Sequence, residues 1–84
     1  MKEFTFTVTD PMGIHARPAG LLVKEAKKYE SAITMLKGSR KGDLKKIFTI
    51  MALGVKQGET VTVQVEGADE EAAAMVETFL KENF

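Results

Sequence analysis

The chain has 84 residues, of which 44% are hydrophobic and 29% charged, a composition typical of one small globular domain spanning residues 1–84. Lysine and arginine number 12, as do aspartate and glutamate, so no excess charge directs the chain to nucleic acid or to a membrane surface. The absence of cysteine excludes disulfides, thiol catalysis and thiolate metal sites.

The size and the apolar pattern narrow the class further. A domain this small has room for one core and no deep substrate cavity, which argues against a self-contained enzyme. The first residues carry no signal-peptide core, and no apolar run approaches the roughly 20 residues that span a bilayer. A small secreted domain would often carry disulfides. We therefore expect a cytoplasmic protein without membrane insertion.

The first half of the chain changes from strand spacing to helix spacing. Phe4, Phe6 and Val8 alternate with threonines, which predicts a half-buried strand, and residues 10–13 predict a turn. From Ala16 onward the spacing predicts a helix whose apolar stripe consists of Ala19, Leu22, Val23, Ala26 and Tyr29. A second strand is expected over 33–36, then a turn and a short polar edge strand.

The second half predicts two further helices around one strand. Residues 47–53 predict a short helix that is apolar nearly all round, with Gly54 as the residue that closes it. Residues 61–65 alternate valine with polar residues and predict a strand. Asp69 is expected to cap a final helix, with Glu70 and Glu71 in its first turn. The apolar stripe of that helix is Ala72, Met75, Val76, Phe79 and Leu80.

The resulting order is β-α-β-β-α-β-α. Because the strands alternate in polarity, one face of the sheet should be covered and the other exposed to water. The sequence therefore predicts an α+β fold, an open-faced β-sandwich with a four-stranded antiparallel sheet and three helices packed on one face.

The segment Ile14-His15-Ala16-Arg17-Pro18-Ala19-Gly20 contains the only histidine of the chain. His15 falls at or beside the helix N-cap, and Pro18 suits the first turn. We expect the backbone N–H groups of Ala16, Arg17 and Ala19 to be free and to form an anion site with the helix dipole. The guanidinium of Arg17 adds a fixed charge that suits phosphate.

An imidazole beside an anion site suits a protein that accepts a phosphoryl group and passes it on. A neutral imidazole nitrogen is a nucleophile, and no second base nearby in sequence is placed to activate water for hydrolysis. The alternative is that His15 is only a surface or capping residue, which is the commoner role of a lone histidine at a helix start. A Ser-His-Asp arrangement is not excluded by composition. A metal site is not expected, because one histidine without cysteine leaves only carboxylates.

The segment Gly13–Ala19 resembles the active-site signature of HPr, the histidine-containing phosphocarrier of the bacterial phosphoenolpyruvate-dependent sugar phosphotransferase system. The similarity covers the whole chain. Residues 44–47 and 50–54 resemble the second-helix segment of the family, and residues 67–70 resemble its entry to the last helix.

This resemblance implies a mechanism. His15 would be phosphorylated on Nδ1 by enzyme I and would pass the phosphoryl group to IIA domains of sugar permeases, while Arg17 would stabilise the transferring group. The protein would be a phosphoryl relay with a phosphohistidine intermediate, not a self-contained turnover enzyme, and would need no cofactor. Regulatory proteins are further candidate partners. A transiently docking carrier is expected to be monomeric.

The resemblance also assigns a docking surface for partner proteins. Ile47, Phe48 and Met51 of the short helix would contribute to it, since exposed aromatic and methionine side chains suit an adaptable interface. For Phe48 the alternative is a core position. Gly20 would either let a partner approach closely or simply be a tolerated small residue.

Lys46 departs from the family pattern. Gram-positive members carry a regulatory serine at this position, the target of HPr kinase, and lysine cannot be phosphorylated in that way. Since lysine is a poor helix cap, we expect Asp43 to cap the short helix instead. Lys45 and Lys46 together are expected to attract acidic partner surfaces.

Two other functions stay open at this point. One is a paralogous carrier with a regulatory role, for example in a nitrogen-related branch of the phosphotransferase system. The other is a small binding module with the same fold and no phosphoryl chemistry. The sequence does not name the sugar or the enzyme I.

Overall fold

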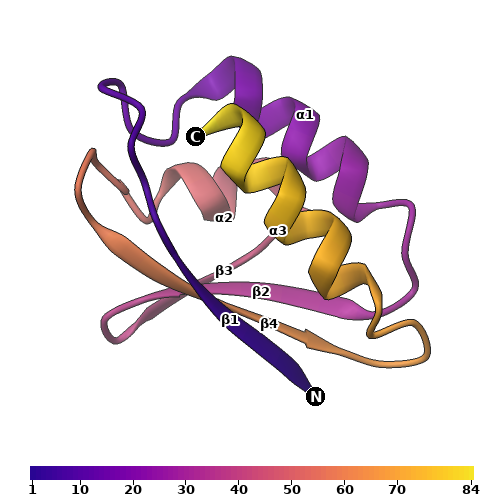
Figure 1. The fold of residues 1–84 in the computed structure, drawn as a ribbon. Helices are drawn as coiled ribbons and strands as arrows, with labels where there is room; N and C mark the ends of the chain where they lie inside the picture. Colours follow the sequence, from indigo (N-terminus) through magenta and orange to yellow (C-terminus); the bar gives the residue numbers. More distant parts are fainter.

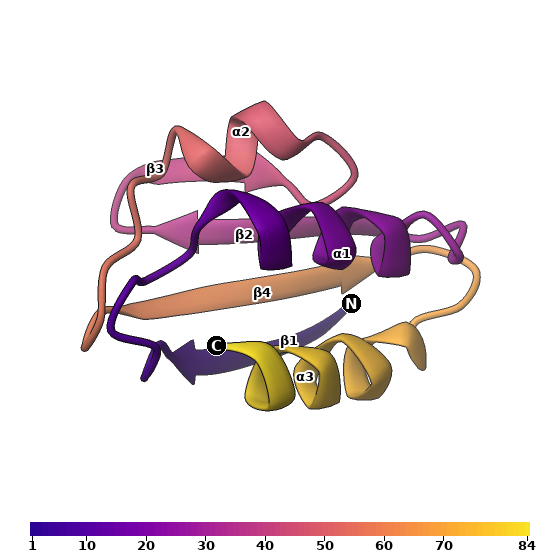
Figure 2. The ribbon, with the colours of Figure 1, turned by 90° about the horizontal axis from the view of Figure 1, so that it is seen from above.

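The computed structural model describes residues 1–84 and contains four strands and three helices. In chain order they are β1 (Lys2–Thr7), α1 (Ala16–Ala26), β2 (Ala32–Lys37), β3 (Arg40–Asp43), α2 (Ile47–Met51), β4 (Thr60–Glu66) and α3 (Ala72–Asn83). All strand pairs are antiparallel, in the order β1-β4-β2-β3. The three helices cover one face of the sheet (Figures 1 and 2). The predicted open-faced α+β sandwich is confirmed, and β3 is the polar edge strand.

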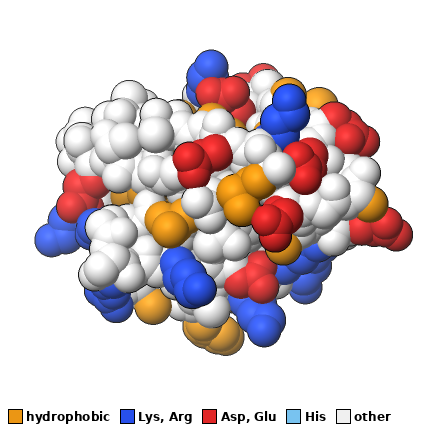
Figure 3. All heavy atoms as spheres, turned by 90° about the horizontal axis from the view of Figure 1, so that it is seen from below, with side chains coloured by type: hydrophobic (Ala, Val, Ile, Leu, Met, Phe, Trp, Pro, Cys, Tyr) orange, Lys and Arg blue, Asp and Glu red, His pale blue; other side chains and the backbone are white.

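The hydrophobic core lies between the sheet and the helix layer. The valines of β4, at positions 61, 63 and 65, are almost fully buried, as expected from their alternation with polar residues. From the helix layer, Leu22 of α1, Ile50 of α2 and Val76 of α3 reach the same core. Each such buried side chain contributes roughly 1.5–3 kcal/mol. The other face of the sheet, seen in Figure 3, is a surface of charged and uncharged polar groups with scattered hydrophobic side chains.

The start of α3 differs from the prediction. Asp69 does not cap this helix, which begins at Ala72 with Glu71 at the N-cap and no side-chain cap. The carboxylate of Asp69 instead accepts hydrogen bonds from the backbone N–H groups of Glu30 and Ser31 and from the Ser31 hydroxyl. Ser31 is buried, so its N–H would be costly to leave unpaired. The sequence analysis assigned the Asp69 carboxylate to the start of α3, but in the structure it hydrogen-bonds to the loop between α1 and β2.

The apolar stripe of α3 is narrower than predicted. Ala72, Val76 and Leu80 are fully buried and Phe79 is half-buried, but Met75 is 54% exposed. The centre of the helix face that packs on the core therefore runs through positions 72, 76 and 80, and Met75 lies beside it on the solvent side.

Asp43 does not cap α2, contrary to the expectation from sequence. The helix begins at Ile47 with Lys46 at the N-cap and no side-chain cap. The Asp43 carboxylate accepts the backbone N–H of Lys45, which precedes the helix, at 2.8 Å. The hydroxyl of Thr49 in the first turn of α2 accepts the backbone N–H of Asp43 at 2.8 Å. The Asp43 side chain therefore stabilises the turn between β3 and α2, and Thr49 fastens that turn to the helix.

Candidate functional site

His15 is the N-cap residue of α1, with extended backbone angles of φ −122° and ψ 170°. The turn that leads to it is held against the loop between α2 and β4. Gly13 has a φ of +66°, and a Cβ atom at this position would lie 2.4 Å from the carbonyl oxygen of Val55. The backbone N–H of Ile14 donates to that same oxygen at 3.0 Å. Only glycine allows this approach, which sets the position of His15.

The end of α3 holds the other side of the turn. The carbonyl oxygen of Phe84 accepts the backbone N–H groups of Thr9 and Asp10, both at 2.7 Å. The Phe84 ring is buried and meets the His15 ring edge-on, with ring centroids 6.5 Å apart. His15 thus stands on a turn that is fastened to two other parts of the chain, while its side chain stays 29% exposed.

Asp10 is a site residue that the sequence analysis missed. One carboxylate oxygen, Oδ1, accepts the backbone N–H of Met12 at 2.8 Å, and the other, Oδ2, lies 3.4 Å from Nε2 of His15. The hydrogen bond from Met12, assisted by His15, holds the pKa of Asp10 below its ordinary value against the opposing effect of partial burial. Asp10 at the head of a turn was visible in the sequence, but its second contact depends on how the turn folds.

The start of α1 provides two of the three predicted backbone donors. The N–H groups of Ala16 and Arg17 bond to no backbone or side-chain acceptor of the chain. The N–H of Ala19 is not free, because it donates to the His15 carbonyl as the first intrahelical bond, at 3.0 Å. Pro18 is the third helical residue and has no N–H to satisfy. Arg17 is exposed and forms no ion pair within the chain.

The four predicted docking residues lie on the two adjacent helices α1 and α2. Phe48 is 85% exposed, so the alternative of a core position is wrong for this residue. Ile47 and Met51 are half-buried and pack against the core. A Cβ atom at Gly20 would lie 3.9 Å from Ile47, an ordinary contact, so no close approach within the chain requires this glycine.

Two exposed apolar side chains near the site were not predicted. Leu21 on α1 is 50% exposed and Met12 in the turn before His15 is 71% exposed. Leu21 could have been found, because it falls outside the buried stripe of α1. Together with Phe48 they add apolar surface on α1, on α2 and in the turn.

Lys45 and Lys46 differ in their surroundings. The ammonium group of Lys45 donates to the carbonyl oxygen of Tyr29 at 2.7 Å and is partly buried. Lys46, at the N-cap of α2, is exposed and makes no ion pair. Of the two charges, only Lys46 is free to meet an acidic surface.

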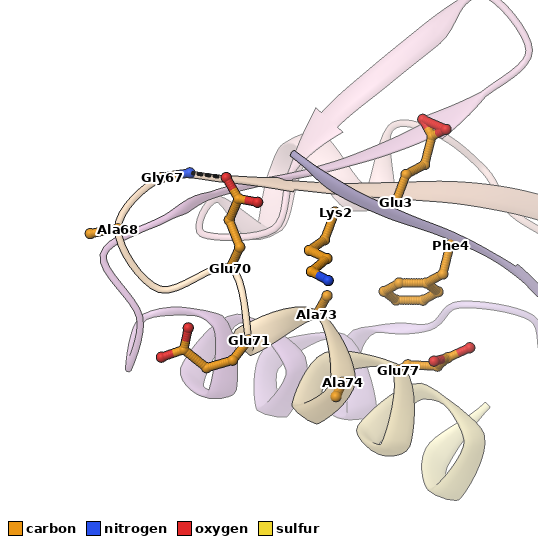
Figure 4. Close-up of a pocket in the computed structure, with 10 residues that line it drawn as sticks. All are labelled: Lys2, Glu3, Phe4, Gly67, Ala68, Glu70, Glu71, Ala73, Ala74 and Glu77. Carbon is orange, nitrogen blue, oxygen red and sulfur yellow. Dashed lines mark hydrogen bonds between the residues drawn. The ribbon is translucent and has the colours of Figure 1, made fainter.

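One groove lies away from His15. A groove of about 670 Å³ lies where β1 begins, whereas His15 follows the end of β1. Figure 4 shows its lining, with Lys2 over Ala73 and the Glu70 carboxylate bonded to the Gly67 N–H. No group of three or more potential metal ligands is present. None of the three helices has the length and the apolar character of a membrane span.

The geometry therefore brings together one partly exposed imidazole, two free backbone N–H groups at a helix N-terminus and an unpaired guanidinium. A carboxylate faces one ring nitrogen, and the other ring nitrogen, Nδ1, has no partner in the chain. Such a site can hold an anionic group against the helix start and can bond it through a ring nitrogen.

Comparison with known proteins gives a consistent result. A family model described as the phosphorylation site of the PTS HPr component matches residues 2–82. The phosphocarrier protein HPr of Mycoplasma genitalium is 40% identical, over 99% of this chain and 97% of that protein. HPr of Mycoplasma capricolum is 42% identical, over 87% of this chain and 82% of that protein. The crystal structure of HPr-C-His from Thermoanaerobacter tengcongensis superposes with a TM-score of 0.92 at 41% identity, covering 100% of this chain and 96% of that one.

Proposed function

Because the chain belongs to the HPr family of phosphocarriers of the phosphotransferase system, we propose that it accepts a phosphoryl group from phospho-enzyme I on His15 and passes it to IIA domains of sugar permeases. The observation that carries this proposal is the position of His15 at the N-cap of α1. There its imidazole stands beside the free N–H groups of Ala16 and Arg17.

Each part of the site then has a role in the transfer. Nδ1 of His15 is the nucleophile, since Nε2 is the nitrogen that faces Asp10. The backbone N–H groups of Ala16 and Arg17 hold phosphoryl oxygens, favoured by the dipole of an 11-residue helix. The exposed guanidinium of Arg17 neutralises the charge that grows on the transferring group.

The partner surface comprises Gly20, Ile47, Phe48 and Met51, extended by Leu21. The exposed Phe48 supports it, because an aromatic side chain left in water by the fold is a typical anchor for a partner protein. Lys46 contributes a free charge, and without a serine at this position the carrier lacks the control exerted by HPr kinase. We propose that the carrier acts in the cytoplasm as a monomer, a state that suits transient docking to several partners.

The test is phosphoryl transfer followed by phosphorus NMR. The protein is incubated with enzyme I, Mg²⁺ and phosphoenolpyruvate, beside His15→Ala. We expect an acid-labile phosphohistidine signal that is absent from the variant. Transfer of the signal to a IIA domain would identify the sugar pathway. No signal with several enzymes I, in a protein that is folded by NMR, would contradict the proposal and favour a binding module.

A further inference from the structure

Asp10 is held in place by contacts that leave one of its carboxylate oxygens for His15. Its backbone N–H donates to the Phe84 carbonyl at 2.7 Å, and its Oδ1 atom accepts the Met12 N–H at 2.8 Å. These two bonds fix the backbone and the side chain, so that Oδ2 lies 3.4 Å from Nε2 of His15. No other charged group of the chain forms an ion pair with either residue.

The identity of the facing group decides which ring nitrogen carries the proton. An ionised carboxylate can only accept hydrogen bonds, and the Met12 N–H favours the ionised form of Asp10 by lowering its pKa. Nε2 must therefore be the donor in this contact. A neutral imidazole has one N–H, which leaves Nδ1 with a free lone pair.

We infer that Asp10 is a positioning residue that keeps the His15 proton on Nε2 and thereby presents Nδ1 as the nucleophile. The inference deepens the proposed function and rests on it. The buried Phe84 ring packs edge-on against the imidazole, so the His15 ring is bounded both by Asp10 and by an aromatic side chain.

The contact should gain strength during transfer. The Nδ1 lone pair forms a bond to phosphorus, and the bond from phosphorus to the donor atom breaks with its electron pair leaving on the donor. The proton stays on Nε2, so the ring becomes positively charged beside the Asp10 carboxylate. A distance of 3.4 Å is long for a hydrogen bond in the resting protein, and such contacts often tighten when charge develops.

Asp10→Asn tests this role with little change in shape. The Asn side-chain oxygen can still accept the Met12 N–H, which turns its NH₂ group toward Nε2. An NH₂ donor there favours the opposite tautomer, with the proton on Nδ1 and no lone pair for attack. Asp10→Ser is a second variant, since its hydroxyl can keep the bond to Met12 but no group then faces Nε2.

Glu59→Gln is the matched control. The Glu59 carboxylate also accepts a backbone N–H in a turn, that of Lys56 at 2.7 Å, and also has a charged neighbour, Lys37 at 3.0 Å. It makes no contact with His15. The substitution therefore removes the same charge from a similar turn and should leave the imidazole unchanged.

The first readout is the ring nitrogen-15 NMR spectrum at about pH 8, where an ordinary histidine is neutral. It requires no enzyme I. We expect the Nε2–H form to dominate in the wild type and in Glu59→Gln, a shift toward the Nδ1–H form in Asp10→Asn, and a mixture in Asp10→Ser. Equal tautomer populations in all four proteins would overturn the inference.

The second readout is the rate of phosphoryl transfer from phospho-enzyme I. We expect Asp10→Asn to be at least about tenfold slower, as expected for loss of a charge-assisted contact, and Glu59→Gln to keep the wild-type rate. A wild-type rate in Asp10→Asn would also overturn the inference. If the wild-type protein accepts no phosphoryl group, the proposed function is contradicted. The effect of Asp10 on the His15 tautomer is then judged from the NMR readout alone.

Discussion

At the scale of single residues, the imidazole of His15 is placed by backbone hydrogen bonds of the turn before it and by its contact with the Phe84 ring. The position of His15 is set by a turn whose backbone N–H groups donate hydrogen bonds to the backbone oxygens of Val55 and Phe84. Gly13 has no side chain, which makes the first of these contacts possible. The chemistry of the site therefore depends on a residue that carries no functional group.

Gly13→Ala should be more destabilising than its positive φ alone explains. A Cβ atom would lie 2.4 Å from the Val55 carbonyl oxygen, so the turn must move away from the loop between α2 and β4. A left-handed conformation costs an alanine roughly 1–2 kcal/mol. We expect the clash to add about 1–3 kcal/mol to this. Urea unfolding of the purified variant measures the total.

Gly54→Ala separates the two contributions. Gly54 has a φ of +60°, close to the value at Gly13, but a Cβ atom there would have no neighbour within 4 Å. This variant should show only the conformational cost. If both variants lose the same free energy of unfolding, the approach of Gly13 to Val55 does not constrain the turn.

At the scale of secondary-structure elements, the order of strands and helices could be predicted from sequence, but the caps of α2 and α3 and the C-terminal ends of α1 and α2 could not. Alternating polarity in β1 and β4 and helical spacing in α1 are local signals that agree with their burial. An aspartate near a helix start is a weaker signal, because its carboxylate can bond any N–H that the fold brings near. Asp69 bonds Ser31, 38 positions away in the sequence.

The candidate site also has parts that could be predicted from sequence and a part that could not. The sequence predicted His15, the free N–H groups of Ala16 and Arg17, and the exposure of Phe48. These predictions rest on local features, namely a short motif and a short helix with more apolar residues than its core-facing side can bury. The contact between Asp10 and His15 did not, since it requires a turn that is closed by Val55 and Phe84. Tertiary contacts decide which local donor meets which acceptor.

One side of the short helix α2 packs on the core and the other faces solvent. Substitutions on the solvent side therefore test docking without a large change in stability. Phe48→Ala removes an 85% exposed ring, so its free energy of unfolding should stay within about 0.5 kcal/mol of the wild type. If Phe48 anchors partner proteins, the KM of enzyme I for the carrier should rise about tenfold or more. Steady-state transfer assays at several carrier concentrations measure this.

Met75→Ala is the matched control for Phe48→Ala. Met75 is also a large exposed apolar side chain, at 54%, but it lies on α3 and outside the predicted docking surface. Both the stability and the KM should remain near those of the wild type. An equal rise of KM in the two variants would show that exposed apolar area in general, and not the surface around Phe48, governs docking.

At the scale of the whole molecule, Asp69 joins two loops at the same end of the sheet. Its carboxylate accepts from Glu30 and Ser31, and the Ser31 hydroxyl in turn accepts the Asp69 N–H at 3.0 Å. The loop from α1 to β2 and the loop from β4 to α3 are thereby closed on each other. His15 lies at the other end of α1, so this connection can affect stability without touching the site.

The charge of Asp69 should make part of this stability depend on pH. The Ser31 hydroxyl, followed by the backbone N–H of Glu30, lowers the pKa of Asp69 from its ordinary value of 3.8. A carboxyl whose pKa is lower in the folded protein than in the unfolded chain stabilises the fold above the unfolded value. The contribution is lost as the pH falls below 3.8 and through the folded value.

Asp69→Asn should therefore be less stable than the wild type near neutral pH, and the difference should shrink below about pH 4. Glu66→Gln, which removes an exposed carboxylate at the end of β4, should follow the wild-type curve. Urea unfolding from about pH 2 to 7 distinguishes these cases. If the free energies of unfolding of Asp69→Asn and the wild type differ by the same amount across this range, the charge of Asp69 does not contribute. The Asp69 contacts would then stabilise the two loops by shape and hydrogen bonding alone.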